Sequence, residues 1–137
     1  MEGSSIRILV VDDYQPWRRF VCSMLQKQPG LLVVGEAGDG LDAVQRAQSR
    51  KPDLILMDVG LPKLNGIEAA NRIGAVAPAA KILFLSTTHD ANVVHAALNN
   101  GAMGYVLKAT AGAELLLAIK AVLRGEEFVS SRLTEYQ

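Results

Sequence analysis

The sequence of 137 residues has little of several residue types, and each shortage argues against a class of protein. It has one cysteine, Cys22, so an internal disulfide or a cysteine-based metal site is excluded, as suits a reducing cytosol. No apolar run approaches the roughly 18 residues needed to cross a bilayer, and no signal peptide precedes the first apolar stretch. The formal net charge is zero, without the basic excess that nucleic-acid phosphates require. We therefore expect a cytoplasmic domain that binds no membrane and, by itself, no DNA.

Half of the residues are hydrophobic, which is enough to fill the core of one domain. Short apolar runs alternate with longer stretches in which apolar residues recur at helical spacing. The runs predict strands at residues 6–11, 31–37, 54–57, 82–85 and 103–107. The longer stretches predict helices that begin near Trp17, Leu41, Gly66, Asp90 and Gly112, with Asp90 as an N-cap.

Five strands that alternate with five helices indicate an α/β fold with helices on both faces of a parallel sheet. Right-handed crossovers leave few arrangements, and the simplest is a doubly wound, flavodoxin-like sheet in the order 2-1-3-4-5. We expect this domain to span residues 1–125. Residues 126–137 are more polar and are expected to form a tail or the start of a linker to an output domain.

Polar residues follow four of the five predicted strands. Asp12 and Asp13 follow the first strand, Asp58 the third, Ser86 the fourth and Lys108 the fifth. Ligands of open α/β sheets bind beyond the carboxyl ends of the strands, near the point where the strand order reverses. The first and third strands flank that point, so we expect the three acids to lie together there.

Three neighbouring carboxylates repel one another and become stable together when a divalent cation is bound. Oxygen ligands favour Mg²⁺ over zinc, and Mg²⁺ also accepts phosphate oxygens. Lys108 and Ser86 suit the remaining oxygens of a phosphoryl group, and an aspartate can attack phosphorus to give an acyl phosphate. The spacing thus suggests Mg²⁺-assisted aspartyl phosphotransfer. Taken singly, Asp12-Asp13 would more often cap a helix, and Asp58, Ser86 and Lys108 would be ordinary turn or surface residues.

The motifs VVDD, LILMDVGLPKLNGIE, LFLST and GAMGYVLK occur in this order over residues 6–124. Together they resemble the receiver domain of bacterial two-component response regulators. The GYVLK-Ala form and the GEEFVSSRL segment are similar to the NarL/FixJ (LuxR-type) subfamily. The resemblance implies a signalling phosphoacceptor domain, not an enzyme with an external substrate, that assists only its own phosphorylation and dephosphorylation.

The resemblance also implies a role for each site residue. Asp58 would be the phosphoacceptor. Asp13 and Asp58 would bind Mg²⁺ directly with the Gly60 carbonyl, and Asp12 would act through water. Lys108 would bind the phosphate.

Ser86 would be the switch hydroxyl. Tyr105 would be the aromatic switch, although a fixed core aromatic is an equally good interpretation. The implied partner is a sensor histidine kinase. Residues 90–124 would form the output face, which could also mediate a homodimer. DNA would be bound only through a helix-turn-helix output domain beyond residue 137.

Three residues depart from the usual receiver pattern. Ala109 replaces the proline after the lysine, so we expect a trans peptide bond there. Thr87 replaces a small residue beside the phosphate entry, and Gly60 leaves the acyl phosphate unshielded. Thr87 and Ala109 favour an alternative, an interaction module that is not phosphorylated. A third interpretation, a haloacid-dehalogenase-like phosphatase, is disfavoured because it needs an acid at the position of Gly60.

Overall fold

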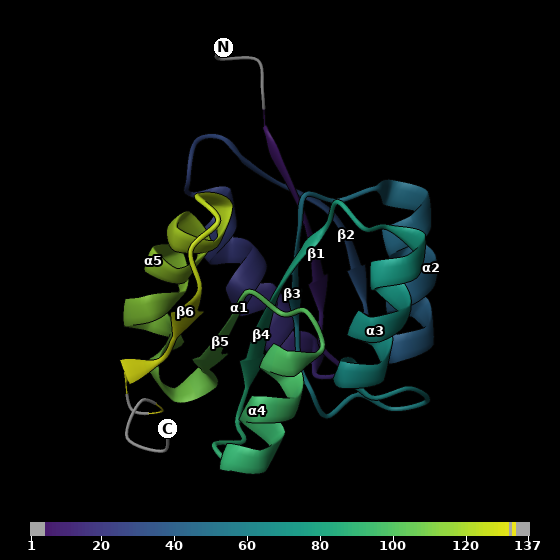
Figure 1. Cartoon of the computed structure of the whole chain (residues 1–137). Coiled ribbons are helices and arrows are strands. Elements are labelled where there is room, and N and C mark those ends of the chain that lie inside the picture. The colour runs from purple at the N-terminus through teal and green to yellow at the C-terminus, as the bar shows by residue number, and fades with distance from the viewer. Residues whose placement is uncertain (1–4, 132, 134–137) are drawn as a thin grey trace.

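A computed structural model describes residues 5–131 and 133 and contains one sheet of six parallel strands (Figure 1). The strand order is β2-β1-β3-β4-β5-β6. The strands are β1 (Ile6–Val11), β2 (Leu31–Ala37), β3 (Leu54–Met57), β4 (Lys81–Ser86), β5 (Gly104–Leu107) and β6 (Phe128–Val129). The predicted doubly wound fold is confirmed, and the first three strands have the predicted bounds.

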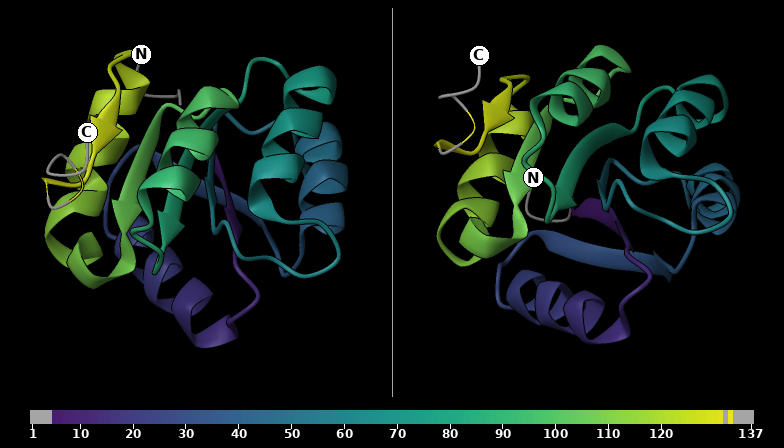
Figure 2. Two further views of the ribbon diagram at one scale, coloured as in Figure 1. Left: turned by 60° about the horizontal axis from the view of Figure 1, so that its bottom comes forward. Right: turned by 90° about the horizontal axis from the view of Figure 1, so that it is seen from below.

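Five helices cover both faces of the sheet, as two views in Figure 2 also show. They are α1 (Gln15–Gln26), α2 (Gly40–Arg50), α3 (Gly66–Val76), α4 (Ala91–Asn99) and α5 (Ala111–Leu123), and a 3-10 turn, η1 (Lys108–Thr110), precedes α5. Helices α1 and α5 pack on one face, and α2, α3 and α4 pack on the other. Within the described residues, no helix is long and apolar enough to cross a membrane.

Strand β1, in the interior of the sheet, is apolar on both faces because helices cover both. In β1, Leu9 and Val11 join the core under α2, α3 and α4, whereas Ile8 and Val10 join the core under α1 and α5. Cys22 belongs to the second core, and burial raises the pKa of its thiol to about 11. It is therefore a small buried hydrophobic group.

The short strand β6 was not predicted, so the expected five-stranded sheet is one strand short. Phe128 and Val129 pair with Gly104 and Tyr105 of β5, and Ser130 behind them is fully buried. The sequence predicts a tail or linker here because the segment is polar. Two residues are too few to show the alternating pattern of a strand. Residues 132 and 134–137 of that segment lie outside the described residues.

Candidate functional site

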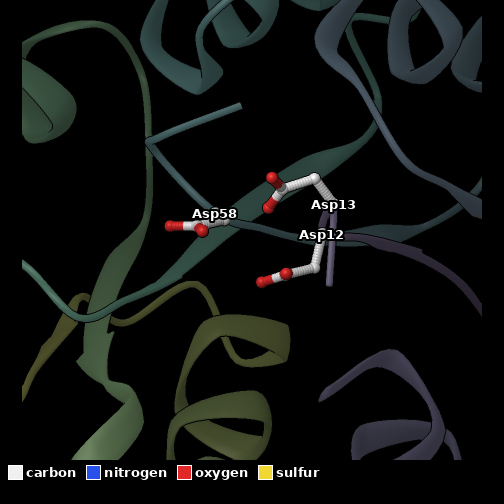
Figure 3. A group of neighbouring side chains, drawn as sticks. All are labelled: Asp12, Asp13 and Asp58. Atoms are coloured by element: carbon white, nitrogen blue, oxygen red, sulfur yellow. The ribbon is translucent and has the colours of Figure 1, made fainter. Parts of the chain in front are cut away.

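The carboxyl ends of β1 and β3 bring three acids together. Parallel pairing continues past the strands, since the Asp12 amide donates to the Ala37 carbonyl (3.0 Å) and the Asp58 amide to the Val11 carbonyl (3.1 Å). One carboxylate oxygen from each of Asp12, Asp13 and Asp58 lies within 4.8 Å of the others. Figure 3 shows the three carboxylates grouped at this edge of the sheet. The predicted acidic cluster is therefore present.

Lys108 reaches this cluster from the end of β5. Its ammonium donates to Asp12 Oδ2 (2.5 Å) and to Asp58 Oδ2 (3.3 Å), and its side chain is only 14% exposed. The lysine thus lies between the buried acid and the expected phosphoacceptor. The peptide bond that follows it, before Ala109, is trans as predicted, because the described residues contain no cis peptide bond.

Asp12 is the buried member of the cluster, at 1% exposure. Burial raises the pKa of Asp12 above its ordinary value, although hydrogen bonds from Lys108 and from the Tyr14 amide act in the opposite direction. The N-cap residue of α1 is Tyr14, so neither acid of the pair occupies the cap position. The set of three carboxylates and one ammonium fits a hard cation that adds positive charge and binds oxygen.

The loop after β3 holds Asp58 in place through close backbone contacts. The Gly60 amide lies 3.4 Å from Asp58 Oδ1, and the Gly66 amide donates to the Val59 carbonyl (2.7 Å). A Cβ atom on Gly66 would lie only 2.1 Å from the Asp58 carbonyl oxygen, so only glycine fits there. Asn65 caps α3 by accepting from the Glu68 amide (2.9 Å). Metal binding by the Gly60 carbonyl stays a prediction.

Ser86 and Tyr105 are joined through the loop after β4. Ser86 is 2% exposed, and its Oγ accepts from the Thr88 amide (3.2 Å). The Tyr105 hydroxyl donates to the Thr88 carbonyl (2.9 Å), and its ring is fully buried beside Phe84. Tyr105 therefore already lies inward in this structure. Thr87 is exposed, so its side chain is not buried within the site.

Two α1 residues near this cluster were not predicted to belong to the site. The Arg18 guanidinium donates to the Asp12 carbonyl (2.6 Å) and pairs with Glu36. The Trp17 ring lies under the Lys108 ammonium, with its centroid 5.2 Å from Nζ. For Arg18, the position about one helical turn after the acidic pair is a signal that could have indicated its contact with Asp12, whereas the contact of Trp17 with Lys108 depends on how α1 packs beside the end of β5.

The chain matches the response regulator receiver domain family over residues 8–120. It therefore belongs to this family, and it is a signalling domain, not a catalytic enzyme. This agrees with the sequence-based identification of both the family and its LuxR-type branch.

Similar proteins include a two-component response regulator of the LuxR family from Aurantimonas sp. SI85-9A1. Its structure gives a TM-score of 0.91 at 35% identity, covering 96% of this chain and 94% of that chain. The receiver domain of the putative response regulator NarL from Mycobacterium tuberculosis gives 0.85 at 28% identity, covering 90% and 100%. The uncharacterized transcriptional regulatory protein YxjL of Bacillus subtilis (strain 168) is 41% identical over 126 residues, which are 92% of this chain and 58% of YxjL. The chain thus spans little more than half the length of YxjL and of similar full-length regulatory proteins.

Proposed function

We propose that this domain accepts a phosphoryl group on Asp58 in a Mg²⁺-dependent reaction and thereby switches a transcriptional regulator. The observation that carries the proposal is the Lys108 ammonium placed between Asp12 and Asp58 within the three-carboxylate cluster. Receiver domains of response regulators interact with sensor kinases, so the proposed donor is a phosphohistidine on such a kinase.

In the proposed reaction, a carboxylate oxygen of Asp58 attacks phosphorus in line with the phosphohistidine bond. The P–N bond breaks, and the imidazole leaves with its electron pair. Asp13, Asp58 and the Gly60 carbonyl would hold Mg²⁺ directly, and Asp12 would act through water. The ion would neutralise negative charge on the phosphoryl oxygens. Lys108 moves from Asp12 toward one phosphoryl oxygen, and the Ser86 hydroxyl donates to another. Hydrolysis of the acyl phosphate at the same site resets the domain.

The phosphorylated state is proposed to bias the face formed by residues 90–124. Ser86 and Tyr105 both contact Thr88, so a movement of the Ser86 hydroxyl reaches the start of α4 and the middle of β5. That face would then serve a homodimer. The relatives are transcriptional regulatory proteins, and DNA would be bound only by an output domain beyond this receiver.

The decisive experiment is intact-mass spectrometry after incubation with acetyl phosphate and MgCl₂. We expect one adduct of about 80 daltons, its loss in Asp58→Asn, and its loss when EDTA removes the metal. Asp53→Asn is the matched control, because Asp53 precedes β3 at the opposite edge of the sheet. It should be labelled like the wild type.

Two results would contradict the proposal. A label that persists in Asp58→Asn would place the phosphoryl group elsewhere. A folded wild-type domain that binds neither Mg²⁺ nor beryllofluoride would indicate a phosphorylation-independent interaction module.

A further inference from the structure

The Lys108 ammonium has three N–H groups, and three groups of the described residues interact with it. Two are the carboxylate oxygens of Asp12 and Asp58, at 2.5 and 3.3 Å. The third is the face of the Trp17 ring, whose centroid lies 5.2 Å from Nζ. This distance is within the range in which a cation is attracted to an aromatic ring, and the attraction is stronger where water is excluded. The lysine side chain is 14% exposed, so the contact is largely shielded from solvent.

The position of the Trp17 ring is fixed by the same acid that holds the lysine. Asp12 Oδ1 accepts from the Tyr14 amide (2.9 Å) at the start of α1, while Asp12 Oδ2 accepts from Lys108. Arg18 ties the next part of α1 to the Asp12 carbonyl (2.6 Å). Asp12 therefore fixes the position of both partners: the start of the helix that carries the ring, and the ammonium that lies over the ring.

The Trp17 ring has two further contacts. It packs against Phe20, one turn along α1, with ring centroids 5.1 Å apart and planes tilted by 39°. The half-buried side chain also packs against the core under α1 and α5. The ring is thus a fixed surface, whereas the lysine has a long, flexible stem.

From this geometry we infer that Trp17 is a positioning residue for Lys108, a role that rests on the proposed phosphotransfer at Asp58. The ring limits how far the ammonium can move away from the space between Asp12 and Asp58, because it covers a third side of the ammonium. The lysine then needs only a short movement from Asp12 to meet the incoming phosphoryl oxygen. Packing of α1 alone would need an apolar side chain at residue 17, but not an aromatic face.

The contact itself can be tested without any phosphorylation. Trp17 is the only tryptophan of the chain, so its fluorescence reports on this ring alone. We expect Lys108→Met to change the emission intensity or wavelength of the unphosphorylated protein. Lys120→Met, which removes an exposed ammonium on α5, should leave the spectrum unchanged. Identical spectra for wild type and Lys108→Met would overturn the inference.

The role can be tested by the rate of Asp58 labelling with acetyl phosphate at saturating Mg²⁺. Trp17→Leu keeps an apolar side chain but removes the ring, and we expect it to be about threefold to tenfold slower. Trp17→Phe should recover a rate within about twofold of wild type, because it restores an aromatic face. Met24→Ala is the matched packing control, since Met24 packs on the same core two turns farther along α1. It should label at the wild-type rate.

The outcomes separate this inference from the proposed function. Absence of labelling at Asp58 in the wild type would contradict the proposed function. Normal labelling of wild type with an equal rate for Trp17→Leu would overturn the role of Trp17 alone. A Phe variant as slow as the Leu variant would overturn it too, because shape and not the aromatic face would then matter.

Discussion

At the scale of single residues, the two oxygens of Asp12 already have protein partners. Oδ1 accepts from the Tyr14 amide and Oδ2 from Lys108, and the side chain is almost fully buried. Asp13 is exposed and Asp58 is partly so. This difference supports the proposal that Asp13 and Asp58 bind the cation directly while Asp12 acts through water. It also explains why the buried acid needs the ammonium when the site has not reacted.

Gly60 offers a residue-scale prediction about the lifetime of the acyl phosphate. It is exposed, its φ is not positive, and a Cβ atom there would meet nothing within 4 Å. Gly60→Met should therefore fold normally and place an apolar side chain near Asp58. We expect water to be partly excluded and dephosphorylation to slow by about threefold, a change of roughly 0.7 kcal/mol in the barrier. Loss of label with time, followed by mass spectrometry after removal of acetyl phosphate, measures it.

The control for this variant is Gly74→Met on α3, another glycine with open space at Cβ. It should keep the wild-type lifetime. A Gly60→Met protein that loses its label as fast as Gly74→Met would show that residue 60 does not shield the phosphoryl group.

At the scale of elements, helix α3 contains two glycines with opposite surroundings. Gly66 begins the helix under the Asp58 carbonyl, where a Cβ atom would clash with backbone at 2.1 Å. Gly74 lies near the end of the helix with open space around it. The same substitution should therefore have opposite effects on stability at the two positions.

We expect Gly66→Ala to lower the free energy of unfolding by about 2 kcal/mol or more, because backbone atoms must move. Gly74→Ala should raise it by about 0.5–1 kcal/mol, since alanine loses less backbone entropy in a helix. Urea unfolding followed by circular dichroism measures both. Equal effects of the two substitutions would contradict this account. Gly66→Ala should also slow Asp58 labelling, because its clash is with the backbone of the proposed phosphoacceptor.

The sequence was most informative where an element is regular and buried. The apolar runs of β1, β2 and β3 gave their bounds directly, and the residues after strand ends gave the acidic cluster and Lys108. The contact of Trp17 with Lys108 could not be read from spacing, because it depends on how α1 packs beside the end of β5. Strand β6 was not predicted, because it has only two residues and polar residues flank it. The burial of Ser130 could not be predicted either, because it is a polar residue outside any periodic apolar pattern.

At the scale of the whole molecule, the segment after α5 is joined to the residues around Lys108. Ser130 Oγ accepts from the Leu107 amide (2.9 Å) and donates to Glu114 Oε1 (2.6 Å). Thr110, just after Lys108, donates to the same Glu114 oxygen (2.7 Å). Ser131 reaches the other oxygen through its amide and hydroxyl (both 3.3 Å). Glu114 therefore connects the C-terminal segment to the strand end that carries the lysine.

This arrangement predicts a pH-dependent contribution to the stability of the domain. Burial alone would raise the pKa of Glu114, but hydrogen bonds from Ser130, Thr110 and Ser131 together lower it below its ordinary 4.5. A lowered folded-state pKa stabilises the protein above the unfolded value, and that stability is lost as the pH falls through the folded-state value. At pH 7, Glu114→Gln should reduce the free energy of unfolding by about 1 kcal/mol, after allowance for solvent screening.

The measurement is urea unfolding of wild type and Glu114→Gln from pH 7 to below pH 4.5. The difference between the two proteins should be largest at pH 7 and shrink below pH 4.5, because protonated glutamate and glutamine are nearly isosteric. Glu126→Gln is the matched control: Glu126 pairs with Arg124 in solvent and should show no measurable difference at either pH. A Glu114→Gln difference that stays constant over this range would show that packing, and not the ionised carboxylate, joins the C-terminal segment to the domain.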